Sequence, residues 1–79
     1  MRYLAMFHTH MSALRTKEKL AGAGVQARLA PVPRKLSASC GTCVLYMAEE
    51  PYLQYMDGDV ESVYRVLGDE EYALIKDYA

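Results

Sequence analysis

The spacing of apolar and polar positions predicts four β-strands. Residues 2–8 are apolar or aromatic at nearly every position, which is typical of a strand buried on both faces. Residues 25–29 alternate between apolar and polar, which predicts a half-buried strand. Residues 42–48 contain the β-forming run Cys43 to Met47, and residues 60–67 form a further strand-like run.

Three other segments predict helices. After a capping Thr9 or Ser12, apolar residues recur at helical spacing to about Ala23, where neighbouring glycines supply a stop. Residues 49–56 open with two glutamates and a proline, which suit the first turn of a helix. Residues 68–79 open with acidic side chains, which suit the positive end of a last helix.

The element order therefore predicts an α+β fold. The order β-α-β-β-α-β followed by a helix is the ferredoxin-like arrangement, with residues 1–67 as its core and residues 68–79 as a C-terminal helix. A chain of 79 residues is expected to form a single domain, 1–79. Right-handed crossover makes the first two strands parallel, with the third between them. This topology brings the end of the first strand, the loop 34–41 and the start of the fourth strand to one end of the sheet.

Composition predicts a soluble, cytoplasmic protein. Apolar residues make up 52% of the chain and charged residues 24%, as in ordinary globular domains. No apolar run approaches the length of a membrane span, and the apolar stretch at the N-terminus is too short for a signal peptide. We therefore expect no association with a membrane.

Charge is unevenly distributed along the chain, although the net charge is only −1. Residues 1–35 hold seven of the nine Lys and Arg residues, and residues 36–79 hold nine of the ten acids. The two sets either neutralise each other in the fold or form a dipolar surface that docks a partner or a second copy. An open sheet face and a tyrosine-rich C-terminal half favour a homodimer. A pI near 6.1 argues against nucleic-acid binding.

The two cysteines form a CxxC motif, Cys40-Gly41-Thr42-Cys43. A reducing cytoplasm disfavours a structural disulfide, so the motif indicates redox chemistry, metal binding or a thiol that forms a persulfide. Cys40 is the leading candidate, because the preceding Arg34 and Lys35 and free loop amides would favour its thiolate. The alternative is a small buried side chain in a tight loop. Cys43 lies in a predicted strand and is either a core residue or a second thiol.

A metal site is the less favoured use of these cysteines. His8 and His10 lie at the same predicted end, so with Cys40 and Cys43 they would make a two-Cys, two-His zinc site. Their spacing is not that of a zinc finger, and a HxH pair between a strand and a helix is more typical of a cap and surface. We therefore predict no metal site and no cofactor.

The loop before the cysteines resembles a known family. The segment from Pro33 to Gly41, with Ser39-Cys40-Gly41 as its most specific part, follows a short strand-helix-strand unit and is similar to a small bacterial family of Se/S carrier-like proteins. The resemblance spans about residues 3–66. It implies that Cys40 is the carrier thiol. The residues that it implies shape the loop are Arg34, Ser37, Ser39 and Gly41. Cys43 lies outside the family pattern.

The leading functional hypothesis is a sulfur or selenium carrier. Cys40 would accept the atom from a donor protein and pass it to an acceptor protein. One alternative is a non-catalytic ferredoxin-like module, regulatory or homodimeric, in which the loop is structural. The other is a metal-binding protein that uses cysteine and histidine side chains. Whether the protein is an enzyme stays open from the sequence.

Overall fold

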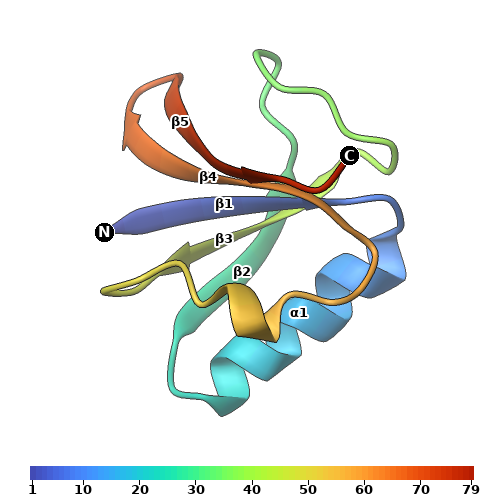
Figure 1. The fold of residues 1–79 in the computed structure, drawn as a ribbon, viewed down its shortest axis with the longest axis vertical. Coiled ribbons are helices and arrows are strands. Elements are labelled where there is room, and N and C mark those ends of the chain that lie inside the picture. The colour runs from blue at the N-terminus through green and yellow to red at the C-terminus, as the bar shows by residue number, and fades with distance from the viewer.

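The computed structural model describes residues 1–79 as one five-stranded antiparallel sheet with a single α-helix packed on one face (Figure 1). The elements are β1 (Arg2–Phe7), α1 (His10–Gly22), β2 (Gln26–Pro31), β3 (Thr42–Met47), the short 3-10 helix η1 (Leu53–Tyr55), β4 (Val60–Gly68) and β5 (Glu71–Asp77). No helix has the length and the apolar character that crossing a membrane requires.

The strands lie in the order β2-β3-β1-β4-β5, and each neighbouring pair is antiparallel. The prediction that the third strand lies between the first two is confirmed. β1 pairs with β3 on one side, Leu4 opposite Leu45, and with β4 on the other, Leu4 opposite Tyr64. β1 is thus the central strand, which explains why its residues from Tyr3 to Phe7 are all buried.

The two faces of the sheet are covered by different elements. On the first face, α1 covers a core of nine buried residues, which includes Phe7 from β1 and Leu20 from the helix. On the second face, Leu4, Met6 and Cys43 are buried. Three side chains of the loop that links β2 and β3 help to cover them: Val32, Leu36 and Ala38. This loop therefore covers buried side chains on the second face, as α1 covers them on the first face.

The helix predicted at residues 49–56 is not formed, and that prediction is wrong. The segment contains only the three-residue η1. Tyr52, just before it, adopts a left-handed backbone conformation with φ 51°, which interrupts any helix that begins at Glu49. The Tyr46 hydroxyl donates a hydrogen bond to the carbonyl oxygen of Pro51 and holds this irregular segment against the sheet.

The C-terminal helix predicted at residues 68–79 is also wrong, because the segment is the edge strand β5. Asp69 and Glu70 form a tight turn between β4 and β5, and Glu70 takes the left-handed conformation, φ 55°, that such hairpins require. β5 then pairs with β4, Val66 opposite Tyr72 and Tyr64 opposite Leu74. With one α-helix and five antiparallel strands, the fold is not the two-helix ferredoxin-like arrangement expected from the sequence.

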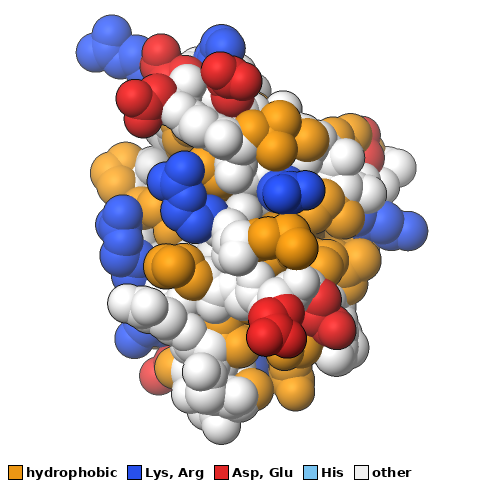
Figure 2. Space-filling model, turned by 90° about the vertical axis from the view of Figure 1, so that its left-hand side faces the viewer, with side chains coloured by type: hydrophobic (Ala, Val, Ile, Leu, Met, Phe, Trp, Pro, Cys, Tyr) orange, Lys and Arg blue, Asp and Glu red, His pale blue; other side chains and the backbone are white.

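Charged side chains surround apolar surface at the end of the sheet where β1 begins. Figure 2 shows this end, with Lys and Arg side chains beside exposed apolar atoms and acidic side chains above and below them. Met47 and Leu74 are both about half exposed, 54% each, although both belong to strands.

Candidate functional site

Three segments meet at the opposite end of β1, as the strand order predicts. The backbone N–H of His8 donates to the carbonyl oxygen of Asp59 at 3.2 Å, which joins the end of β1 to the start of β4. The Cys40 thiol lies 3.3 Å from the carbonyl oxygen of Phe7, which joins the β2–β3 loop to β1. The candidate thiol therefore lies where these segments converge.

Cys40 is half-buried in a loop that is closed at its base. The N–H of Val32 donates to the carbonyl oxygen of Gly41 at 3.0 Å, so the two ends of the loop are tied together. Gly41 has φ 72°, a conformation that glycine adopts at little cost. The Cys40 sulfur faces two acceptors, the carbonyl oxygens of Phe7 and Thr42, each at 3.3 Å. A reduced thiol can donate its proton to either of them.

Two histidines hold the residues on either side of Cys40. Nδ1 of His8 lies 3.3 Å from the hydroxyl of Ser39, and Nδ1 of His10 lies 3.3 Å from the hydroxyl of Thr42. Both imidazoles are on exposed residues and contact hydroxyl groups that lie one and two positions from the cysteine in the chain. Their role in this geometry is to position the loop.

Glu61 is a third side chain that contacts the loop, after His8 and His10, and the sequence did not reveal it. Its carboxylate accepts a hydrogen bond from the backbone N–H of Ser39 at 2.9 Å and lies 3.8 Å from Nδ1 of His8. Glu61 is the second residue of β4, and no motif in the sequence relates it to a cysteine 21 positions earlier. Only the pairing of β4 beside β1 brings it to the loop.

Asp59 fixes the same end of the sheet to the start of α1. Its carboxylate accepts hydrogen bonds from the hydroxyls of Thr9 at 2.9 Å and Ser12 at 3.0 Å. The Thr9 hydrogen bond is the main reason that the pKa of Asp59 lies below its usual value, with smaller contributions from Ser12 and the nearby His8. Thr9 also accepts from the N–H of Ser12 as the N-cap of α1, and is therefore the cap of the two that the sequence offered. The acid therefore has a structural role here.

Cys43 is in a different environment from Cys40. Its side chain is fully buried on the second face, with its sulfur 3.7 Å from the carbonyl oxygen of Pro31. Burial raises the pKa of the Cys43 thiol to about 11, although Arg28 opposes the shift. Both cysteines are free thiols. Cys43 is therefore protonated near neutral pH and shielded from reagents.

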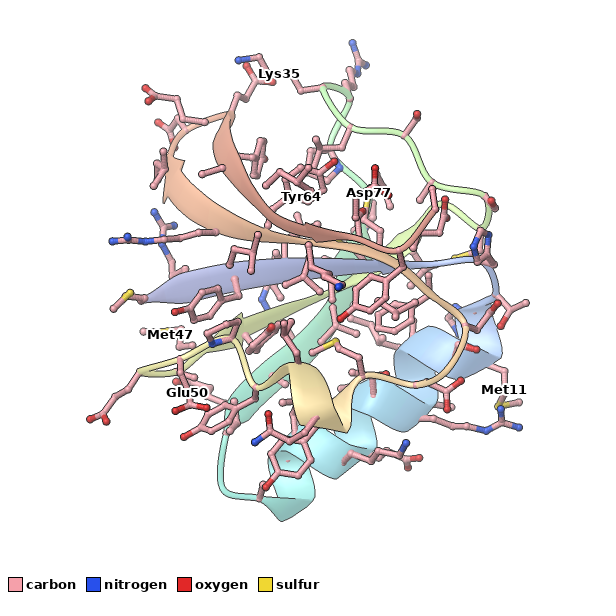
Figure 3. The ribbon with its side chains drawn as sticks, viewed as in Figure 1. Met11, Lys35, Met47, Glu50, Tyr64 and Asp77 are labelled. Carbon is pink, nitrogen blue, oxygen red and sulfur yellow. The ribbon has the colours of Figure 1, made fainter.

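The cations expected beside Cys40 are not among its hydrogen-bond partners. The Nζ of Lys35 donates a hydrogen bond to the carbonyl oxygen of Glu70 at 2.7 Å. The positive charge of Lys35 therefore lies beside the β4–β5 turn (Figure 3). Arg34 is exposed. Ser37 is exposed too and lines a cavity of about 180 Å³ together with His8 and Glu61.

The four residues of the possible zinc site do not converge. His8 and His10 contact hydroxyls, Cys40 contacts carbonyl oxygens, and Cys43 is buried on the second face. The structure contains no group of three or more His, Cys, Asp and Glu side chains that could hold a metal ion.

Alkylation should distinguish the two thiols. At pH 8, iodoacetamide is expected to modify Cys40 and leave Cys43 untouched, because only Cys40 is partly exposed. Intact-mass analysis of the folded protein should therefore show one adduct per chain, and the protein unfolded in urea should show two. Peptide mapping that locates the first adduct on Cys43 would contradict this assignment.

Comparison with known proteins assigns the chain to a family. Residues 2–71 match the family model described as "Putative Se/S carrier protein-like", so the chain belongs to this family. Among curated proteins, the "Uncharacterized protein YtiA" of Escherichia coli strain K12 is 33% identical over 42 residues. That match covers 53% of this chain and 49% of YtiA, about half of each protein. No solved structure matches the chain.

Proposed function

We propose that the protein carries sulfur or selenium as a terminal atom bound to Cys40. Membership of the Se/S carrier-like family supports the type of cargo. The observation that carries the choice of residue is the contrast between the two thiols: Cys40 is partly exposed in a braced loop, whereas Cys43 is fully buried. A carrier thiol has to meet the thiols of other proteins, and the partial exposure of Cys40 supports its choice over Cys43.

Loading requires a donor that holds a persulfide. The Cys40 thiolate attacks the terminal sulfur of the donor persulfide and forms a new S–S bond. The donor's own S–S bond breaks, its electron pair leaves with the donor thiolate, and that thiolate takes up the proton that Cys40 lost. The transfer is neutral in electrons and needs no cofactor. The same steps apply to a terminal selenium atom.

Delivery runs by the same chemistry in reverse. A nucleophile on an acceptor protein attacks the terminal atom, and the Cys40 thiolate leaves. Gly41 favours both encounters, because a Cβ atom built there would meet nothing within 4 Å and the backbone beside the thiol faces open space. The hydrogen bonds to Ser39 and Thr42 keep the loop in one position while either partner approaches.

The direct test is to load the protein with sulfur. The reduced chain is incubated with a cysteine desulfurase and cysteine, and the intact mass is measured before and after dithiothreitol. We expect a gain of one sulfur atom per chain, located on Cys40 by peptide mapping and removed by the reductant. A chain that stays unloaded while the desulfurase itself becomes persulfidated would reject the proposal.

Glu61 should control loading through the loop. Glu61→Ala removes the acceptor of the Ser39 N–H and should lower the rate of sulfur loading several-fold, because the loop then samples other conformations. Glu61→Gln retains an oxygen acceptor and should load at nearly the normal rate. Time-resolved mass analysis gives both rates.

The matched control for this series is Glu49→Ala, which removes an exposed acid at the other end of the sheet, next to Ala48, whose N–H donates to the carbonyl oxygen of Met1. Thermal unfolding of each variant shows whether a slower rate reflects loss of the fold. Equal rates for the alanine and glutamine variants of Glu61 would mean that its hydrogen bond does not position Cys40.

A further inference from the structure

We propose that the second face of the sheet holds a separate pocket for a small organic anion, one with an apolar body and an anionic oxygen headgroup. The pocket lies near the start of β1, whereas Cys40 contacts Phe7 at its end. It is therefore a second site, and it does not depend on the carrier function.

The pocket has the size and lining of a small-molecule site. Its volume is about 450 Å³, within the range of cavities that hold small ligands. Its apolar floor is the partly exposed Leu45, which is paired across β1 and β3 with the fully buried Leu4. One wall comes from Pro31 at the end of β2 and Pro33 in the loop that follows, and the other from Val66 and the β4–β5 turn.

A hydrogen bond joins the two walls. Lys35 follows Pro33 in the loop, and its Nζ donates to the carbonyl oxygen of Glu70 in the β4–β5 turn at 2.7 Å. Pro33 and Glu70 both line the pocket, on opposite sides. The loop after β2 and the β4–β5 turn are therefore in direct contact, although they lie 35 residues apart in the chain.

Two arginines beside the floor supply the affinity for an anion. Arg28 lies opposite Leu45, and Arg2 lies opposite Val66, so the strand pairing puts both arginines on the same face as the apolar floor. The salt bridges of the structure, His8–Glu61 and Lys19–Asp57, include neither arginine. A guanidinium group binds carboxylate, sulfonate or phosphate oxygens through paired hydrogen bonds.

The charges also set the direction in which a ligand binds. Asp69 and Glu70 lie in the turn that forms the other wall, across the floor from Arg28. An anionic headgroup is attracted to Arg28 and repelled from the turn, so the apolar body extends over Leu45 and towards Tyr72. This separation of charge also makes a second copy of the chain the competing occupant, since its turn could face these arginines.

The test uses two fluorescent probes that differ in charge. Anilinonaphthalene sulfonate carries an apolar aromatic body and a sulfonate, and phenylnaphthylamine has a similar body without the anion. We expect one sulfonate probe to bind per chain, about tenfold or more tightly than the neutral probe. Arg28→Gln and Arg2→Gln should each weaken the sulfonate probe about tenfold and leave the neutral probe unchanged.

The control variant is Arg15→Gln, which removes an exposed arginine on α1, the helix that covers the first face. Its probe binding and its thermal unfolding should match those of the unmodified chain. Equal affinity for the two probes, or equal weakening by Arg15→Gln, would overturn the proposal. A second copy of the chain would be the occupant instead if one probe bound per two chains and if its affinity changed with protein concentration over the range in which sedimentation shows a dimer forming.

Discussion

Replacing Cys40 with serine is expected to abolish sulfur loading completely while the protein stays folded. A serine hydroxyl cannot hold a terminal sulfur, so no persulfide can form at that position. The fold should survive, because the hydroxyl can donate to the same carbonyl oxygens of Phe7 and Thr42 that face the thiol. Intact-mass analysis after incubation with a desulfurase and cysteine, together with thermal unfolding, measures both effects.

The matched variant is Cys43→Ala, which removes the second thiol without burying a hydroxyl. Because Cys43 is fully buried, this variant should load sulfur on Cys40 to the normal extent. If a folded Cys43→Ala protein also failed to load, the two cysteines would act as a pair, in line with their CxxC spacing. A Cys40→Ser protein that still gained a sulfur atom would disprove the assignment of the carrier thiol.

The general position of the candidate site could be predicted from the sequence, because it depends only on the first four strands. Their hydrophobic patterns are clear, and their order places His8, the Cys40 loop and Asp59 at one end of the sheet. The immediate surroundings of the thiol could not be predicted in this way. Arg34 and Lys35 in the sequence predicted positive charge around the thiol, but the Lys35 side chain binds the carbonyl oxygen of Glu70 instead. Glu61 contacts the loop only because β4 pairs with β1, which the sequence does not reveal.

The errors in the fold have a local physical cause. Acidic residues after Gly68 are typical of a helix start, but here Asp69 and Glu70 form a hairpin turn. The usual signal for such a turn is a glycine or asparagine at the left-handed position, and Glu70 occupies it instead. Tyr52 likewise has a positive φ of 51° just before η1, and as a tyrosine it gives no sequence signal for this backbone conformation. Non-glycine residues with positive φ are rare, so sequence patterns predict them poorly.

Raising the pH from 9 to 11 is expected to destabilise the protein through Cys43. Burial raises the pKa of its thiol from the ordinary 9.0 to about 11, so in this range the unfolded chain loses the Cys43 proton and the folded chain keeps it. Stability is therefore complete below pH 9 and falls as the pH rises towards 11. After allowance for solvent screening, the loss is on the order of 2 kcal/mol. Burial also raises the pKa of Tyr46, which adds a loss in the same direction above pH 10.

Urea unfolding at pH 8, 9, 9.5 and 10 measures the first part of this loss, and Cys43→Ala is the variant that isolates it. The alanine leaves a small cavity and lowers stability at every pH, so the comparison concerns the slope of stability against pH, not its level. Between pH 9 and 10 the unmodified chain and Cys40→Ser should lose stability, and Cys43→Ala should be nearly flat because Tyr46 contributes mainly above that range. Parallel slopes in all three proteins would contradict the prediction, because they would show that the Cys43 thiol ionises as readily in the folded chain as in the unfolded one. A buried sulfur that faces the carbonyl oxygen of Pro31 should resist ionisation in the folded chain.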